Sequence, residues 1–473
     1  MRSKVLYILL TAFLIAVILC GISFSDRIFA STIQAVPTSS DEPVSSDCNH
    51  SSDAFCSHLP LLLIQTKGSG IEYGVPHWSE ISLINNKNGK NHTEDNPLFT
   101  TASTIWIRGQ SSSRFEKKSY GIEFFKEQES IKRRDLSILG MAADSDWVLH
   151  GPYLDKSLMR NHLSYHIARQ SMFWAPETRY VEMFLDGSYE GIYLIVESPR
   201  VRETRIPFAD YALLSGETAY LLQRNRVNTD TTALNCFGSY TGKVFYPLYI
   251  RYPIDRNLTA AQSQWITADI SRFERALYSD YFKDSRRGYK AYINMDSFAT
   301  YYVIAEFSMN KDSGFLSTYC CKNIGGKLMM GPVWDFNNGF DHYPGYPTDP
   351  GPDGDGFYIA DNNWYERLMQ DPAFVEVVIA KYREMRQTVL STKFMLQFID
   401  ETEEYLGDSI NRNFERWSYS FVRNFLGGHD ENGNSRELSS HADAIKQLKK
   451  TIVARGLYLD EHIELLYHYC DMN

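Results

Sequence analysis

The pattern of apolar and polar positions divides the folded chain into two parts. In the first part, short runs with a period of two predict strands, because successive side chains of a strand point to opposite faces. The predicted strands cover residues 59–64, 80–83, 105–108, 119–125, 146–149, 180–185 and 191–197. Asp186-Gly187 is a strong turn signal between the last two runs, so these two strands are predicted to form a hairpin.

The second part has mostly the spacing of helices. Helical patterns cover residues 155–170, which lie among the strands, and then 260–277, 297–307, 364–390, 395–413 and 442–466. Asp155 is placed as the N-cap of the first helix. A break at Ser198-Pro199-Arg200 separates the two parts. The predicted fold class is α+β, with a β-rich part over residues 59–197 and a mostly helical part over residues 198–473.

The N-terminus has the pattern of an export signal. Arg2 and Lys4 precede an apolar run over residues 5–24, and a candidate cleavage point follows Ala30. The apolar run is also long enough to remain as a membrane anchor. Residues 1–30 are therefore predicted to be a signal peptide or a membrane anchor, followed by a flexible spacer over residues 31–58. The expected location is secreted, or extracytoplasmic and membrane-anchored.

The composition is that of a folded protein, and the charge excludes one class of partner. The chain has 473 residues, of which 43% are hydrophobic and 14% aromatic, so it can bury a large core. The formal net charge of −10 argues against broad electrostatic binding to nucleic acid or to an anionic membrane surface. Cys48 and Cys56 close a short loop and are candidates for a disulfide in an oxidising compartment.

A basic turn lies between the strands predicted at residues 105–108 and 119–125. Its small and basic residues are Arg108, Gly109, Ser111, Ser112, Ser113, Arg114, Lys117 and Lys118. A Gly/Ser turn exposes backbone N–H groups and the cations add positive charge, so the turn is a candidate anion cradle. It has neither the GxxxxGK[ST] nor the GxGxxG spacing. A solvated basic turn has the same composition, so both interpretations stay open.

Two aspartates lie at the two ends of a predicted hairpin in the second part. The hairpin joins residues 316–321 to residues 327–332, with Asp312 before the first strand and Asp335 after the second. Neutral oxygen ligands nearby are Asn310, Asn337 and Asn338. Carboxylate and amide oxygens suit hard cations such as magnesium. Asp and Asn also cap turns, so a purely structural role for both aspartates stays open.

Five separated motifs follow one another in the chain. They are IRGQSSS at 107–113 with KKSYG at 117–121, LDKSLMRN at 154–161, VEMFLDGSYEGIYL at 181–194, MDSF at 295–298, and NKD at 310–312 leading through LSTY at 316–319 to GPVWDF at 331–336. In order and approximate spacing they resemble the CotH kinase family, the spore-coat-type atypical secreted kinases. The resemblance runs from Leu59 to Met385, and the CotH-like domain is expected to cover about residues 59–430.

The resemblance implies an atypical protein-kinase-like, two-lobed fold and transfer of the γ-phosphoryl group of ATP to a protein hydroxyl. It also implies magnesium or manganese as the metal. By position, Asp312 is similar to the catalytic aspartate that orients the acceptor hydroxyl, and Asp335 is similar to the metal-binding aspartate. Asn337 is the second metal candidate. Phosphoryl transfer needs positioning and charge neutralisation, which these residue types can supply.

The same resemblance assigns the basic turn to the nucleotide. Lys118 or Lys117 would hold the α- and β-phosphates, with Lys118 preferred, and Arg108 would support the phosphates or the fold. Ser111 and Ser112 complete the candidate nucleotide-binding residues. The expected partner is an extracellular or surface protein that carries the acceptor hydroxyl.

Two departures from the family pattern leave a second function open. The family usually has another aspartate where this chain has Asn337, and many members have a lysine where this chain has Ser198. Asp341 is a candidate to restore the lost charge. The alternative is a catalytically weak or inactive surface or coat protein that binds partners. A carboxylate-based glycosidase, suggested by the many aromatic residues, gives the basic turn no role.

Overall fold

The structure is a computed structural model that describes residues 55–87, 89–208, 216–227, 233–254, 257–343, 356–422, 426–429 and 435–471. The expected signal or anchor, most of the expected spacer and Cys48 lie outside the described residues. Among the described residues, no helix has the length and apolar character needed to cross a membrane.

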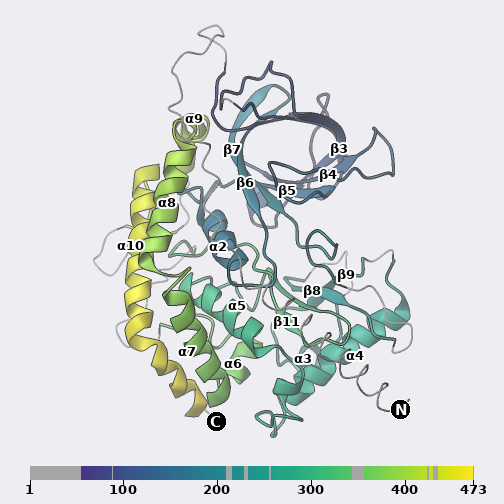
Figure 1. The fold of residues 1–473 in the computed structure, drawn as a ribbon, viewed down its shortest axis with the longest axis vertical. Coiled ribbons are helices and arrows are strands. Elements are labelled where there is room, and N and C mark those ends of the chain that lie inside the picture. The colour runs from purple at the N-terminus through teal and green to yellow at the C-terminus, as the bar shows by residue number, and fades with distance from the viewer. Residues whose placement is uncertain are drawn as a thin grey trace, which may run out of the picture. The chain divides into compact units, whose positions relative to one another are not determined.

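Seven strands of the first part close into a barrel (Figure 1). The strands are β1 (Leu61–Gln65), β2 (His77–Ile84), β3 (Phe99–Arg108), β4 (Ser119–Phe125), β5 (Asp146–His150), β6 (Thr178–Leu185) and β7 (Ser188–Glu197). Their order is β1-β2-β3-β4-β5-β7-β6. The barrel closes because β1 also pairs with β6 in parallel, whereas β1 with β2 and β6 with β7 are antiparallel.

Branched and aromatic side chains fill the barrel. The buried cluster includes Leu62, Ile64, Ile81, Ile105, Ile122, Phe124, Trp147, Leu149, Val181 and Ile195. These residues come from all seven strands, so no single hairpin could bury them alone. Each strand predicted in residues 59–197 is present, and the barrel closure is a feature that the periodicity did not predict.

Helix α2 (Arg160–Arg169) lies between β5 and β6 in the chain and corrects one prediction. The helix begins at Arg160, and its N-cap is Met159 rather than Asp155. Leu158 has a φ of 66°, which turns the chain out of the helical path just before the first turn. The Asp155 carboxylate still accepts the Arg160 N–H at 2.9 Å, but it does so across this longer turn.

A second, four-stranded sheet has the order β11-β10-β8-β9. Its strands are β8 (Tyr220–Arg224), β9 (Leu248–Tyr252), β10 (Thr318–Lys322) and β11 (Met329–Met330). The predicted hairpin on the way to Asp335 is confirmed, because β10 pairs with β11 in antiparallel fashion. Strand β9 follows a stretch that has no clear periodicity.

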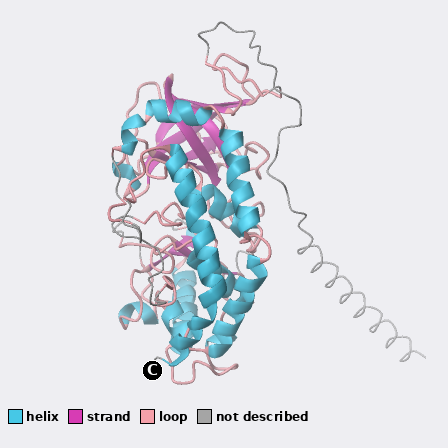
Figure 2. Ribbon diagram, turned by 90° about the vertical axis from the view of Figure 1, so that its left-hand side faces the viewer, coloured by secondary structure: helices cyan, strands magenta, loops and turns pink. Residues whose placement is uncertain are grey.

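The remaining elements are helical. The α-helices are α3 (Phe237–Tyr240), α4 (Ala260–Leu277), α5 (Met295–Phe307), α6 (Trp364–Leu368), α7 (Pro372–Arg386), α8 (Thr392–Leu406), α9 (Ser409–Arg416) and α10 (His441–His462). Shorter 3₁₀ turns are η1 (Ser112–Arg114), η3 (Tyr289–Ala291), η4 (Ser418–Phe421) and η5 (Ile463–Asp471). Helices α8 and α10 contact one another and are among the long helices seen in Figure 2. The α+β class is confirmed.

Two of the predicted helices are each divided. The helix predicted over residues 364–390 becomes α6 and α7, because Asp371 caps a new helix and Pro372 occupies its first turn. The helix predicted over residues 395–413 becomes α8 and α9, because Gly407 ends α8 with a φ of 47°. Because α8 ends at Gly407, α9 does not continue the axis of α8, and α9 contacts barrel strand β7.

Candidate functional site

Helix α2 holds the backbone of Asp335. Asp335 follows β11 in the left-handed region at φ 65°, where residues other than glycine are uncommon. Its N–H donates to the Tyr165 hydroxyl at 3.1 Å, and the Phe336 N–H donates to Asn161 Oδ1 at 2.7 Å. Asn161 and Tyr165 are one helical turn apart and share a face of α2. One face of this helix therefore fixes the direction of the Asp335 side chain.

The first turn of α2 is itself anchored. Burial lowers the pKa of His150 to about 4, so its ring is neutral at pH 7 and can accept from Asn161 Nδ2 at 3.3 Å. Arg160 forms a buried ion pair with Asp155 at 2.5 Å and donates from Nε to the Gly339 carbonyl at 3.2 Å. The LDKSLMRN motif thus contacts both ends of the loop over residues 335–339.

Asp335 is exposed to solvent, and Ser317 contacts its carboxylate. Burial raises the pKa of Asp335, while a hydrogen bond from Ser317 and the charge of Arg108 oppose that rise. The Ser317 hydroxyl donates to Asp335 Oδ2 at 3.0 Å. The Arg108 guanidinium carbon lies 5.3 Å from the centre of the Trp334 ring. The structure therefore brings the end of strand β3 to the loop that carries Asp335.

Asp312 lies close to Asp335. It follows α5 in a turn that its own carbonyl closes by accepting the Leu316 N–H at 2.7 Å. Burial raises the pKa of Asp312, and the negative charge of Asp335 raises it further. Hydrogen bonds from Asn338 Nδ2 at 3.4 Å and from the Tyr343 hydroxyl at 3.3 Å lower it in part. The charge of Asp335 therefore acts on Asp312, and Asn338, three residues after Asp335, bonds directly to the Asp312 carboxylate.

The amides beside the aspartates form a chain. Asn337 Nδ2 donates to Asn338 Oδ1 at 3.1 Å, and Asn338 in turn donates to Asp312. Asn337 is therefore in the same hydrogen-bonded group as Asp312, and it lies two residues after Asp335 in the chain. Asp341, the candidate for restoring charge, instead forms an ion pair with Arg436 at 3.1 Å and is buried.

The basic turn between β3 and β4 is closed by its own contacts. Lys118 Nζ donates to the Ser113 carbonyl at 2.8 Å. Gly109 has a φ of 91°, and a β-carbon placed on it would lie 2.0 Å from Ser112 Oγ, so the turn requires glycine there. Ser111 is exposed. In the described part of the chain, no hydrogen bond joins Ser111, Ser112 or Lys118 to either aspartate.

Lys117 has a contact set that differs from the role the resemblance implies. Its side chain is 2% exposed, and Nζ donates to the Ile192 carbonyl and to Asn413 Oδ1, each at 2.7 Å. The ammonium also lies 5.0 Å from the centre of the Tyr193 ring. Burial lowers the pKa of Lys117 well below its usual range. Both acceptors are internal, so Lys117 joins β7 to α9 rather than facing solvent.

Among the predicted residues, the structure brings together Asp312, Asp335, Asn337 and Arg108. Three further residues complete the site and were not assigned a role from the sequence: Asn161, Tyr165 and Ser317. Asn161 and Ser317 belong to the motifs quoted above, but nothing in the local pattern says that they bond to the Asp335 loop. Their partners lie far along the chain, so only the fold reveals the contacts.

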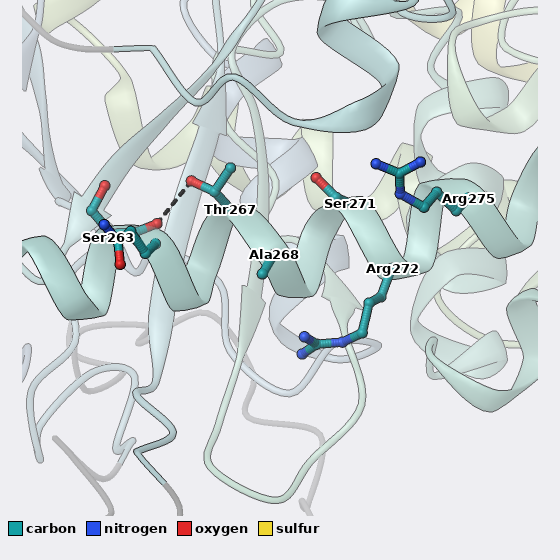
Figure 3. A pocket seen from close by; sticks show the side chains of 7 residues that line it. Ser263, Thr267, Ala268, Ser271, Arg272 and Arg275 are labelled. Carbon is teal, nitrogen blue, oxygen red and sulfur yellow. Dashed lines mark hydrogen bonds between the residues drawn. The ribbon is translucent and has the colours of Figure 1, made fainter.

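A separate hollow lies along one face of α4 and contains none of these residues. Its volume is about 480 Å³, and Figure 3 shows its side chains along the helix. The lining residues are Ser263, Gln264, Thr267, Ala268, Ser271, Arg272 and Arg275. One hydrogen bond among them is internal to the helix, from the Thr267 hydroxyl to the Ser263 carbonyl at 2.8 Å. The hollow has no carboxylate and is distinct from the aspartate pair.

The fold and the site together define an α+β protein with two neighbouring carboxylates and an arginine at the end of a barrel strand. The family model described as CotH kinase protein matches residues 105–459, which is most of the chain. The chain therefore belongs to the CotH kinase family, as the motifs predicted, and it is a kinase-like protein. A comparison with curated proteins gives no match.

Proposed function

We propose that this chain is an ATP-dependent protein kinase that transfers the γ-phosphoryl group to a protein hydroxyl. The observation that carries the proposal is the meeting of Asp312 and Asp335 beside Arg108. The two carboxylates come from opposite ends of the β10–β11 hairpin, and the cation comes from the barrel. A paired acid site next to a fixed cation suits a reaction in which phosphate charge must be neutralised and an acceptor must be oriented.

The donors at Asp335 fit a hard divalent cation. Asp335 and Asn337 would hold magnesium or manganese, which supplies positive charge to the phosphates when bound. The described residues contain no group of three or more His, Cys, Asp or Glu side chains that could hold a metal ion. This agrees with magnesium, which usually takes one or two carboxylates and completes its ligands with water and substrate phosphates.

Each remaining residue has a separate role in the proposal. Asp312 accepts a hydrogen bond from the acceptor hydroxyl and orients its oxygen toward the γ-phosphorus. Arg108 faces the charge that develops on the phosphates. The backbone of the turn at Ser111 and Ser112, shaped by Lys118, covers the phosphates from the barrel side. Lys117 anchors the end of this turn, because it precedes Lys118 in the chain and its side chain is bonded to β7 and α9.

The proposal also includes architecture and location. The barrel forms the nucleotide-side lobe, and the helical part forms the acceptor-side lobe. The chain acts after export, either secreted or anchored outside the cytoplasm, and its partner is an extracellular or surface protein. The apolar run after Arg2 and Lys4 supports export.

Nucleotide binding with and without metal tests the proposal. Addition of ATP with magnesium is expected to raise the melting temperature of the purified chain, and Asp335→Asn is expected to remove most of that shift. Asp312→Asn should keep the shift but lower phosphoryl transfer to protein by about 100-fold or more, because it removes the group that orients the hydroxyl. Asp408→Asn is the control, since Asp408 is exposed and makes no side-chain cap bond. Label transfer that persists undiminished in Asp335→Asn would contradict the metal role.

Two specific features favour a second function, that of a catalytically weak or inactive binding protein. Asn337 is neutral where the family pattern has a carboxylate, and Lys117 is enclosed by internal acceptors. Both features reduce the charge available to a nucleotide. A catalytically weak or inactive surface or coat protein that binds partners would show no ATP-dependent thermal shift, and its partner binding would be unchanged by Asp312→Asn.

A further inference from the structure

One hydroxyl of this chain already lies where the proposed kinase would bind its acceptor. The Tyr343 hydroxyl donates to Asp312 Oδ1 at 3.3 Å. Asp312 is the carboxylate that, under the proposed function, accepts the hydrogen bond of the attacking hydroxyl. The other Asp312 oxygen is occupied by Asn338. The phenol of Tyr343 thus has the contact that an external serine, threonine or tyrosine would need.

The backbone that carries Tyr343 is held in place. Arg436 donates from Nη2 to the Tyr343 carbonyl at 3.1 Å and to the Asp341 carbonyl at 3.2 Å. The ring nitrogens of His342 lie 3.0 Å from the Asn337 carbonyl and 3.1 Å from the Leu154 carbonyl. These contacts tie residues 341–343 to the same loop that carries Asp335. The backbone that carries the phenol is therefore held beside Asp312, and the hydrogen bond to Asp312 sets the position of the hydroxyl.

The charges around the phenol suit a phosphate product. Lys311 Nζ lies 6.0 Å from the centre of the Tyr343 ring, and Arg436 holds the backbone beneath it. A phosphotyrosine carries close to two negative charges at pH 7, which Lys311 can offset in part and which Asp312 repels, whereas Arg436 is already paired with Asp341. The product would therefore leave Asp312, and the acceptor position would become open to another hydroxyl.

We propose that Tyr343 is a site of phosphorylation by the chain itself, in cis, and this inference rests on the proposed kinase function. The Tyr343 oxygen attacks the γ-phosphorus of ATP and forms the new O–P bond. The bond between the γ-phosphorus and the β,γ-bridging oxygen breaks, and ADP leaves with that electron pair. The phenolic proton passes to the Asp312 carboxylate and from there to water. The acceptor is a tyrosine phenol, so the site takes an aromatic hydroxyl at Asp312.

The test uses the purified full chain with γ-labelled ATP and magnesium, and with manganese in parallel. Mass spectrometry of the digested protein is expected to find phosphate on Tyr343, with a labelling rate per chain that does not change on dilution. Tyr343→Phe keeps the ring and removes the acceptor, so this label is expected to disappear. Tyr246→Phe is the matched control, because Tyr246 is 42% exposed and no hydrogen bond joins its hydroxyl to Asp312 or Asp335 in the described part of the chain. Asp312→Asn should slow the labelling by about 100-fold or more.

A pool of peptides that bear serine, threonine and tyrosine separates the two levels of the proposal. Transfer to the pool with Tyr343 unmodified in the wild-type chain would overturn the inference and leave the kinase function standing. Labelling whose rate per chain rises with enzyme concentration would overturn the cis assignment. The absence of both transfer and an ATP–magnesium thermal shift would overturn the kinase function and, with it, the inference about Tyr343.

Discussion

At the scale of single residues, the surroundings of Asp312 and Asp335 oppose the charge of both carboxylates. Asp312 and Asp335 both have raised pKa values, chiefly because of burial, and the charge of Asp335 adds to the effect on Asp312. Hydrogen bonds from Ser317, Asn338 and Tyr343 offset the effect only in part. A carboxylate whose pKa is raised by folding destabilises the fold at neutral pH, and such groups are typical of functional sites.

The raised pKa values predict a gain in stability when either charge is removed. A carboxyl whose pKa is higher in the folded state than in the unfolded state favours folding as the pH falls toward that pKa, and this contribution is lost as the pH rises. At neutral pH, Asp335→Asn and Asp312→Asn are therefore each expected to melt at a higher temperature than the wild type. Solvent screening limits the gain to about 0.5 kcal/mol.

Thermal melts over a pH series check this prediction. The gain should shrink as the pH falls from neutral into the range where carboxyl groups take up protons. Asp408→Asn should show no such pH-dependent difference, because Asp408 is exposed and lies apart from the pair. Lower melting temperatures for both site variants at neutral pH would show that the carboxylates stabilise the fold instead.

At the scale of elements, α2 is the part that turns two short sequence motifs into one site. Its face carries Asn161 and Tyr165, which accept the N–H groups of Phe336 and Asp335, the two peptide groups that flank Asp335. Strand β5 orients Asn161 through His150, and Arg160 reaches Gly339 at the far side of the loop. The helix supports the backbone of the loop that carries Asp335, and none of these groups bonds to the Asp335 carboxylate itself.

Removal of the Asn161 amide is expected to weaken both stability and nucleotide binding. Asn161→Ala leaves the buried Phe336 N–H without its acceptor, which costs about 1–3 kcal/mol of unfolding free energy. The freed loop should also reduce the thermal shift caused by ATP with magnesium. Ser164→Ala is the matched control on the same helix, because the Ser164 hydroxyl donates to the Arg160 carbonyl within α2 and no hydrogen bond joins it to the Asp335 loop in the described part of the chain. Equal nucleotide shifts in the two variants would remove Asn161 from the support of Asp335.

At the scale of the whole molecule, helix α9 from the second part of the chain packs against the barrel. Helix α9 contacts β6 and β7 through polar groups spaced along one face. The pairs are Arg412 with Glu182, Asn413 with Lys117 and Ile192, Arg416 with Glu190, and Trp417 with the Glu190 carbonyl. Asn413 and Lys117 are 296 residues apart. The position of the basic turn therefore depends on the far end of the chain.

This arrangement predicts opposite behaviour for two neighbouring lysines. Lys117→Met leaves two buried acceptors without their donor, so it is expected to lower the unfolding free energy by about 1–3 kcal/mol. Little effect on ATP affinity is expected. Lys118→Met should leave stability nearly unchanged and weaken ATP binding, because Lys118 is half-buried and shapes the turn through Ser113. Chemical denaturation and nucleotide titration of both variants check the pair.

The pH dependence of stability gives a further readout for Lys117. Its lowered pKa means that the unfolded state takes up the proton more readily, so stability rises with pH up to the ordinary lysine range. That rise should be absent in Lys117→Met and present in Lys118→Met. Loss of ATP binding in Lys117→Met with unchanged stability would return the phosphate role to Lys117.

The sequence by itself determined the local structure and the membership of the family. Alternating residues predicted the strands of the barrel, helical spacing predicted α4 and α5, and Asp186-Gly187 predicted the turn between β6 and β7. These features follow from the preferences of neighbouring residues, so they can be read along the chain. The resemblance to the CotH kinase family also marked Asp312 and Asp335, because both lie in the quoted motifs.

Only the tertiary structure decided which of these residues meet. The parallel pairing of β1 with β6 closes the barrel, and no local pattern encodes a contact between such distant segments. Arg108 and Asp312 come from distant parts of the chain, and the fold brings the charge of Arg108 to bear on Asp335 and the charge of Asp335 to bear on Asp312. Lys117 and Lys118 are neighbours of the same residue type, but packing against α9 buries the first alone. Adjacent residues diverge in this way because long-range packing, and not spacing, sets the surroundings of a side chain.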